Sequence, residues 1–367
     1  MTLREPTVEV DALDAHEELY RLGWTDGLPV VPPRPELVEA MLAGGGVEAD
    51  EVVGVLARRH RTITGRQAAV NAVMAGCRPE YFPIVLAALG ALTDPAHNAD
   101  TMLASTGGSA TCVIVSGPLA AEVGMNARHN ALGSGNRANA TIGRAVRLVA
   151  MNVLGARSGK LDAASIGHPG RYSFCFAEDD PPAPWAPLRV RLGYEREDTT
   201  VTVMGCEAPR QIGNALNEDP AGVLRTFASA MKMAATFSVG KGGQGVMVMG
   251  PEHALAVRQA GWSTRRALKF LVEETRVTPR HLEDGGVLLE VGAQHEMELG
   301  DDGKLPTFQD PEDIILVTAG GEGAGWSAYM PAAAPRLHSR HATRRVRTPG
   351  EALPDCGPDS CEVTFTS

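Results

Sequence analysis

A loop rich in glycine, asparagine and basic residues directly precedes an amphipathic segment at residues 137–155. It covers residues 126–136 and reads Asn-Ala-Arg-His-Asn-Ala-Leu-Gly-Ser-Gly-Asn. Unpaired main-chain amides and the positive end of a helix favour an anion at such a junction. His129 is a candidate acid or base near neutral pH. The candidate ligands for a carboxylate or phosphate are Arg128, Gly133, Gly135, Asn136, Arg137, Asn139 and Arg144. The alternative is a surface loop whose asparagines satisfy their own backbone in turns.

Glycine-rich turns also bracket short apolar runs elsewhere in the chain. One run lies between Gly107-Gly108 and Gly117-Pro118, a second lies between Gly242-Gly243 and Gly250-Pro251, and a third, at residues 314–317, leads into the glycines of residues 320–325. Glycine inside an element costs roughly 0.5–1 kcal/mol relative to alanine, so we expect these turns to let the main chain approach a small anionic ligand closely. The second unit adds candidate substrate-binding residues Lys241, Gly242 and Gly243 and candidate catalytic residues Glu252 and His253. For the last two, a capping carboxylate beside a surface histidine is the alternative.

Four side chains near the carboxyl terminus have the chemistry of zinc or copper ligands. They are His338, His341, Cys356 and Cys361. Their spacing differs from that of a zinc finger. A redox-active cysteine pair and an irregular tail with inert thiols are the two alternatives.

Composition excludes several classes of protein. The chain has 367 residues, of which 44% are hydrophobic and 21% charged, as in ordinary globular proteins. A net charge of −10 argues against general nucleic-acid binding, which requires an excess of lysine and arginine. The basic cluster at residues 336–347 indicates a solvated or partner-facing strand edge, or an anion site. The amino terminus lacks the apolar core of a signal peptide, and apolar runs are too short to span a bilayer, so we expect a cytoplasmic protein with no membrane contact.

Apolar runs that alternate with helical periodicity predict an α/β fold. We expect mixed, partly parallel sheets with flanking helices and two pseudo-repeated glycine-rich strand–helix units. Residues 189–192, 200–203, 287–291 and 314–318 are predicted strands, and Asp219 and Ser263 are predicted to cap helices. The expected divisions are an amino-terminal half at 1–180 that contains the anion-binding loop, a second half at 181–335 and a basic, cysteine-containing tail at 336–367. Neither glycine unit matches a dinucleotide-binding or Walker motif.

Several strings together resemble one poorly characterised bacterial family. They lie at residues 24–33, 76–83, 135–144 and 250–254. The family is associated with proteins that carry a selenocysteine-or-cysteine, Gly-Ser-Cys motif and is often labelled thioredoxin-like. The resemblance runs from about residue 20 to 330 and implies a redox-competent partner, but it implies no catalytic residue. The chain has no Cys-x-x-Cys after a strand, and its tail departs from the family's usual ending.

The leading functional hypothesis is an enzyme that acts on a small carboxylate-bearing metabolite. The chemistry would be acid–base elimination, addition or a related carbon–heteroatom step, with a positive cradle stabilising the developing charge. A second hypothesis is a thiol- or metal-dependent enzyme that uses the tail. A third is a non-catalytic scaffold for a small redox protein. The expected partners are therefore a small anionic substrate, and either a second copy of the chain or a redox protein.

Overall fold

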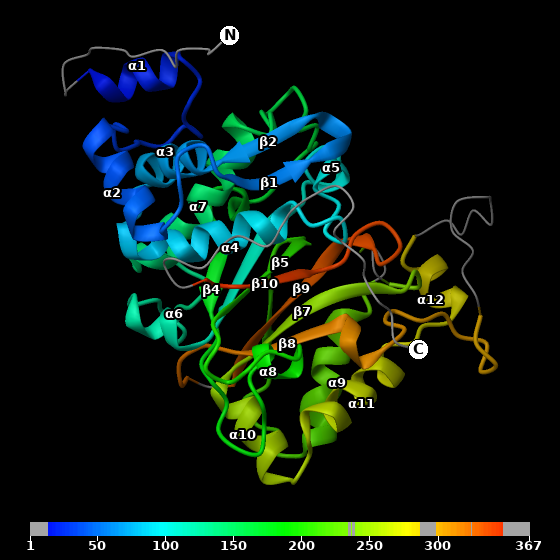
Figure 1. Cartoon of the computed structure of the whole chain (residues 1–367). Helices are drawn as coiled ribbons and strands as arrows, with labels where there is room; N and C mark the ends of the chain where they lie inside the picture. Colours follow the sequence, from blue (N-terminus) through cyan, green and yellow to red (C-terminus); the bar gives the residue numbers. More distant parts are fainter. Residues whose placement is uncertain (1–13, 234–235, 237–238, 287–298, 324, 348–367) are drawn as a thin grey trace.

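The computed structural model describes residues 14–233, 236, 239–286, 299–323 and 325–347 (Figure 1). The described residues form a mixed α/β fold, as the sequence predicts. The strands are β1 (Val52–Leu56), β2 (Arg61–Thr64), β3 (Ala110–Ser116), β4 (Cys175–Ala177), β5 (Thr200–Cys206), β6 (Arg210–Gly213), β7 (Gly243–Met249), β8 (Ile314–Thr318), β9 (Trp326–Pro335) and β10 (Ala342–Arg345). The α-helices are α1 (Ala15–Arg21), α2 (Pro35–Gly45), α3 (Gly65–Ala75), α4 (Phe82–Leu92), α5 (Ala99–Met102), α6 (Pro118–Glu122), α7 (Arg137–Asn152), α8 (Leu188–Arg191), α9 (Pro220–Met231), α10 (Pro251–Gln259), α11 (Thr264–Glu274) and α12 (Pro279–Asp284).

Eight strands form one mixed sheet in the order β4-β3-β5-β9-β7-β8, with β10 beside β5 and β6 beside β9. Because β5 and β9 pair only at Cys206 and Ala332, the sheet consists of two four-stranded halves. The amino half-sheet contains β10, β5, β3 and β4, and the carboxy half-sheet contains β6, β9, β7 and β8. Each half has one parallel pair, β3 with β4 and β7 with β8, and its other pairs are antiparallel.

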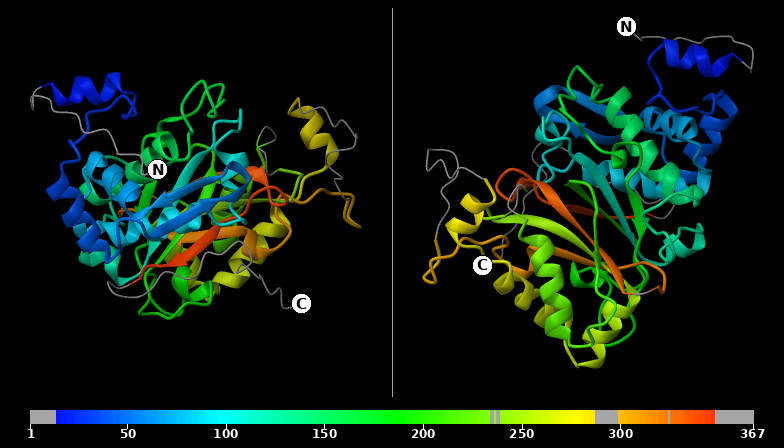
Figure 2. Two further views of the ribbon diagram at one scale, coloured as in Figure 1. Left: turned by 45° about the horizontal axis from the view of Figure 1, so that its top comes forward. Right: turned by 180° about the vertical axis from the view of Figure 1, so that it is seen from behind.

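The two half-sheets enclose a shared core. Side chains that alternate along both sets of strands, such as Ile114, Met204 and Val248, pack in one buried cluster. Helices α4 and α7 cover the outer face of the amino half-sheet, with α3 packed on α7, and α9, α10 and α11 cover the outer face of the carboxy half-sheet (Figures 1 and 2). The order of layers is therefore helix, sheet, sheet, helix.

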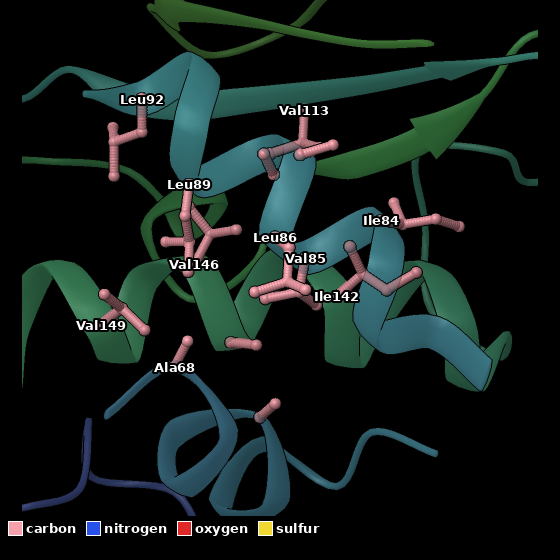
Figure 3. Packing of buried hydrophobic residues seen from close by; sticks show 14 of the residues in the cluster. Ala68, Ile84, Val85, Leu86, Leu89, Leu92, Val113, Ile142, Val146 and Val149 are labelled. Carbon is pink, nitrogen blue, oxygen red and sulfur yellow. The ribbon is translucent and has the colours of Figure 1, made fainter. Parts of the chain in front are cut away.

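Helix α7 shows how the sequence pattern produces this packing. Its predicted apolar stripe includes Ile142 and Val149, which are fully buried against Leu89 of α4 and its neighbours (Figure 3). Asn136 caps the helix, since its side chain accepts a hydrogen bond from the main-chain N–H of Asn139. On its other face, Arg144 and Arg147 form ion pairs with Asp26 and Asp162.

Four local predictions were confirmed and one was wrong. The predicted strands at 200–203 and 314–318 lie in β5 and β8. Asp219 and Ser263 cap α9 and α11 through their side chains. Residues 189–192 were predicted as a strand, but residues 188–191 form the short helix α8. Pro187 at the N-cap starts a helical turn, and the first amide of that turn binds a buried carboxylate described below. The predicted strand at 287–291 lies outside the described residues.

The proposed divisions at residues 180 and 335 stay predictions. Strands from opposite sides of each division pair with one another. Strand β5 and strand β10 follow these points in the sequence, yet both belong to the amino half-sheet with β3. The amino half-sheet therefore contains strands from all three proposed divisions, whereas the carboxy half-sheet takes its four strands from residues 181–335.

Candidate functional site

The asparagines of the loop at 126–136 bond to their own surroundings. Asn139 is buried, and its side chain both accepts from the Asn126 main-chain N–H (2.9 Å) and donates to the Asn126 carbonyl (2.8 Å). The Asn136 side chain donates to the carbonyl of Gly124 in addition to capping α7. Gly133 and Gly135 are exposed in the same turn. The geometry is that of the turn interpretation, in which asparagines satisfy the backbone.

Two arginines of the expected anion cradle are occupied by protein groups. The Arg144 guanidinium donates to both carboxylate oxygens of Asp26, at 2.9 and 2.8 Å, and the two side chains are only 13% and 6% exposed. Arg137 donates through Nε to the carbonyl of Gly76 at 3.0 Å. Arg144 therefore anchors residues 24–28 to α7, and its assignment to a substrate stays a prediction that these contacts do not favour.

The expected ligands in the second glycine unit lie elsewhere. Lys241, Gly242 and Gly243 lie at the beginning of β7, and the Gly242 main chain bonds to Pro306 at 3.3 Å. The turn at Gly250 follows the other end of this seven-residue strand, roughly 20 Å away. These three residues therefore do not share a site with the loop at 126–136.

The three candidate catalytic residues have different surroundings. His253 is buried, with Nδ1 2.7 Å from Ser327 Oγ and Nε2 3.0 Å from the Asn214 carbonyl, so both ring nitrogens are used internally. Glu252 accepts from the Gly323 N–H at 2.5 Å, and His129 Nε2 lies 3.1 Å from the Glu322 carbonyl. These contacts favour a structural role for His253, and its catalytic assignment stays a prediction. Glu252 and His129 contact the same glycine loop, which follows β8.

Only two of the four proposed metal ligands near the carboxyl terminus lie within the described residues. His341 Nδ1 lies 3.3 Å from the Gln244 side-chain oxygen, and burial lowers the pKa of His341 to about 4. His338 is exposed, whereas Cys356 and Cys361 lie outside the described residues. Within the described ranges no group of three or more His, Cys, Asp or Glu side chains is arranged to hold a metal ion. Zinc or copper binding by the tail stays a prediction.

The basic cluster at 336–347 is neutralised within the chain. Arg336 pairs with Asp310 at 2.7 Å and Asp313 at 3.1 Å, and Arg344 pairs with Asp94 at 2.5 Å. These contacts connect the segment around β10 to both half-sheets. They leave little reason to assign an anion site to it.

A pocket that contains several charged side chains forms instead where β3 and β4 end. The two strands are parallel, so their carboxyl ends lie at one edge, the usual place for a ligand in such sheets. A cavity of about 640 Å³ opens there. Its lining comes from parts of residues 117–121, 125–128, 177–180 and 196–197, together with Arg189.

Glu178, the first residue after β4, lines this pocket although its side chain is nearly fully buried. Its carboxylate accepts a hydrogen bond of 2.5 Å from the Ser116 hydroxyl and bonds of 3.0 and 2.9 Å from the Leu188 main-chain N–H. Burial raises the pKa of Glu178 to about 7, although the Ser116 bond, the positive charge of Arg191 and the Leu188 amide each oppose this. The carboxyl group can therefore exchange a proton near neutral pH.

Arg189 completes the polar network beside Glu178. Its guanidinium forms two bonds, of 2.7 and 2.6 Å, with the carboxylate of Asp180, and Nη1 lies 3.3 Å from Ser116 Oγ. The hydrogen bonds to Asp180 hold the pKa of Arg189 above its usual value. Glu178 thus lies in a preorganised set of charges and hydrogen-bond donors.

The remaining walls differ in character. Helix α6 and the loop after it contribute small or apolar surfaces, including Pro118, Ala121 and Met125. Charged side chains lie at the mouth, among them Arg128, whose Nε is 3.5 Å from an Asp179 carboxylate oxygen. Arg128 is the one expected substrate-binding residue that lines the cavity.

The sequence interpretation missed Glu178, Ser116 and Arg189. The available signal was a run of three acidic residues, 178–180, directly after the apolar residues 174–177. That run was not recognised as following a strand because β4 has only three residues. Ser116 directly precedes the Gly117-Pro118 turn, so its place at the end of a strand could be predicted. Its hydrogen bond to Glu178 could not be predicted.

Comparison with known proteins gives no guide to this site. No protein-family model and no curated protein sequence matches the chain. None of the helices in the described part of the chain combines the length and apolar character needed to cross a bilayer. The resemblance noted from the sequence motifs stays a prediction, and the functional argument depends on geometry.

Proposed function

We propose that the protein is an enzyme that transfers a proton to or from a small carboxylate-bearing metabolite in the pocket at the ends of β3 and β4. The observation that carries the proposal is the Glu178 carboxyl, which lines a cavity and has a pKa raised to about 7. A general acid or base is most efficient when its pKa is close to the working pH. Perturbed carboxyls in clefts are also typical of functional sites.

In this proposal the ionised Glu178 removes a proton from the bound substrate. The Ser116 hydroxyl and the Leu188 N–H hold the carboxylate in place, and the positive charges of Arg189 and Arg191 limit the cost of negative charge in a buried position. The protonated carboxyl then returns the proton to a leaving group or to a neighbouring carbon. Elimination, addition and isomerisation all use such a step.

The substrate carboxylate is assigned to the mouth of the pocket. Arg128 and Arg196 both line the cavity, and both side chains are exposed. The apolar part of the substrate would lie against α6. This arrangement replaces Arg137 and Arg144 in the sequence-based hypothesis.

The tail-centred alternative depends on Cys356 and Cys361, and the scaffold alternative depends on a partner. No specific contact among the described residues favours either one. Both stay predictions.

Solvent deuterium incorporation tests the proposal before the substrate has been identified. The full-length protein is incubated in D₂O with pools of small carboxylic acids, and mass spectrometry identifies compounds that exchange a C–H proton. We expect Glu178→Gln to slow the exchange at least about a hundredfold, because it removes the proton acceptor but keeps the volume. Glu312→Gln, the same change at an exposed position, is the matched control. Exchange at an unchanged rate in the Glu178→Gln protein would contradict the proposal.

A further inference from the structure

The charges that line the pocket are nearly balanced, which a site for a simple anion would not require. Three arginines face four carboxyl groups. They are Arg128, Arg189, Arg196, Glu178, Asp179, Asp180 and Glu197. When Glu178 carries a proton, the formal charges cancel. The pocket is therefore not a positive cradle, and a dianion would meet as many repulsive groups as attractive ones.

Two pairs account for most of these charges. Arg189 and Asp180 are joined by two short hydrogen bonds, and Arg128 lies 3.5 Å from Asp179. Arg196 and Glu197 then remain, and within the described residues neither side chain forms an ion pair or a hydrogen bond with another group. The pocket thus presents one cation and one anion without a close polar partner, although Glu197 lies near enough to Arg189 for its charge to help raise the pKa of that guanidinium.

The chain holds Arg196 and Glu197 at a fixed spacing. They occupy the middle of a turn that is closed by two hydrogen bonds, from the Glu195 N–H to the Asp198 carboxylate and from the Asp198 N–H to the Glu195 carbonyl. The Arg196 carbonyl also accepts a bond of 2.9 Å from Arg189 Nε, which connects this turn to the network around Glu178. Both charges therefore belong to the site and not to an unrelated surface.

We infer that the substrate is a zwitterion of the amino-acid type, with its carboxylate at Arg196 and its ammonium group at Glu197. This inference rests on the proposed function and narrows its carboxylate-bearing substrate. A carboxylate alone leaves Glu197 opposed to the ligand's charge, and an ammonium group alone leaves Arg196 opposed. A compound with both groups satisfies both residues, and its side chain can pack on Pro118, Ala121 and Met125.

Three probes with one carbon skeleton test this inference: norvaline, pentanoate and pentylamine. Their binding to the full-length protein is measured by titration calorimetry at millimolar concentrations. We expect norvaline to bind roughly twofold to fivefold more tightly than either of the others, the size of effect that exposed charge pairs give. Pentanoate that binds as tightly as norvaline would overturn the inference, and so would the absence of binding by all three.

Charge-removing variants separate the two contacts. Arg196→Gln should weaken the binding of norvaline and pentanoate and strengthen that of pentylamine. Glu197→Gln should weaken the binding of norvaline and pentylamine and strengthen that of pentanoate. Equal effects of either variant on all three probes would also overturn the inference. Glu178→Gln should keep the preference for norvaline while it abolishes deuterium exchange. Loss of exchange in that variant without any zwitterion preference would therefore refute this inference and leave the proposed function in place.

Discussion

The two parallel strand pairs end in the same way but carry different chemistry. Strand β3 is followed by Gly117-Pro118 and helix α6, and strand β7 is followed by Gly250-Pro251 and helix α10. Ser116 and Glu178 end the first pair, whereas the corresponding residues of the second pair are Met249 and Thr318. One scaffold thus holds a buried carboxyl with a raised pKa at the end of one pair, whereas the side chains at the end of the other pair, Met249 and Thr318, carry no charge. The difference depends on two side chains and not on the fold.

The shared glycines explain the common scaffold. A Cβ on Gly117 would lie 2.4 Å from the Asp198 carbonyl oxygen, and a Cβ on Gly250 would lie 2.0 Å from that of Trp326. Each turn also receives a side-chain bond from the adjoining segment, because Thr199 Oγ1 accepts from the Leu119 N–H and Ser327 Oγ accepts from the Gly250 N–H. Both turns approach the main chain that leads into a neighbouring strand. Close approach to the protein's own main chain therefore explains both glycines, and Gly117 also lines the pocket. The expectation that these turns approach a ligand stays a prediction.

The largest expected effect tests the shared part of the comparison. Gly117→Ala and Gly250→Ala should each destabilise the protein by about 3 to 4 kcal/mol, because each adds an atom where a carbonyl lies. Gly117 has in addition a φ of 138°, which an alanine rarely adopts. Urea unfolding gives the free energies. Gly323→Ala, where an added Cβ meets nothing within 4 Å, is the control and should change stability little. If Gly117→Ala or Gly250→Ala left the free energy of unfolding unchanged, the two turns would not be structurally equivalent.

The second largest effect, on the pH dependence of stability, tests the chemical difference between the ends of the two strand pairs. Because burial raises the pKa of Glu178 from 4.5 to about 7, the folded state holds a proton that the unfolded state releases. This contribution to stability is complete below pH 4.5 and is lost as the pH rises through 7. At roughly 1.4 kcal/mol per pKa unit, the loss is about 3 kcal/mol. Glu178→Gln should remove this dependence, so that its stability relative to the native protein increases between pH 5 and pH 8. Parallel stability curves for the two proteins would show that Glu178 titrates normally.

Much of the framework follows from local patterns, whereas the site does not. The helix caps at Asp219 and Ser263 and the buried stripe of α7 are determined within a few residues, so spacing predicts them. The pairing of Arg144 with Asp26 joins positions 118 residues apart, and no local pattern indicates it. Residues 188–191 form a helical turn, and its first N–H donates to the carboxylate of Glu178, ten residues earlier. Intrinsic secondary-structure propensity does not predict this contact. Contacts between residues far apart in the sequence thus determine which charged side chains pair within the protein and which line the pocket.

A smaller effect concerns the hydroxyl that binds Glu178. The 2.5 Å hydrogen bond from Ser116 lowers the pKa of Glu178, because it stabilises the ionised carboxylate. Ser116→Ala removes this bond, so the titration of Glu178 should move to higher pH by on the order of one unit. Met249→Ala at the corresponding position of β7 removes packing only. It should lower stability at all pH values without shifting the pH dependence. The same shift in both variants would show that the ends of the two strand pairs are not chemically distinct.

Direct titration of Glu178 tests the central claim most closely. Side-chain carboxyl carbons are labelled with carbon-13 glutamate, and the Glu178 resonance is assigned by its absence in Glu178→Gln. The chemical shift is then followed across the pH range in the full-length protein. The account predicts a midpoint near pH 7, well above those of exposed glutamates. A midpoint close to 4.5 would contradict it, because a carboxyl that is fully ionised at neutral pH lacks the property from which the proposed proton transfer was inferred.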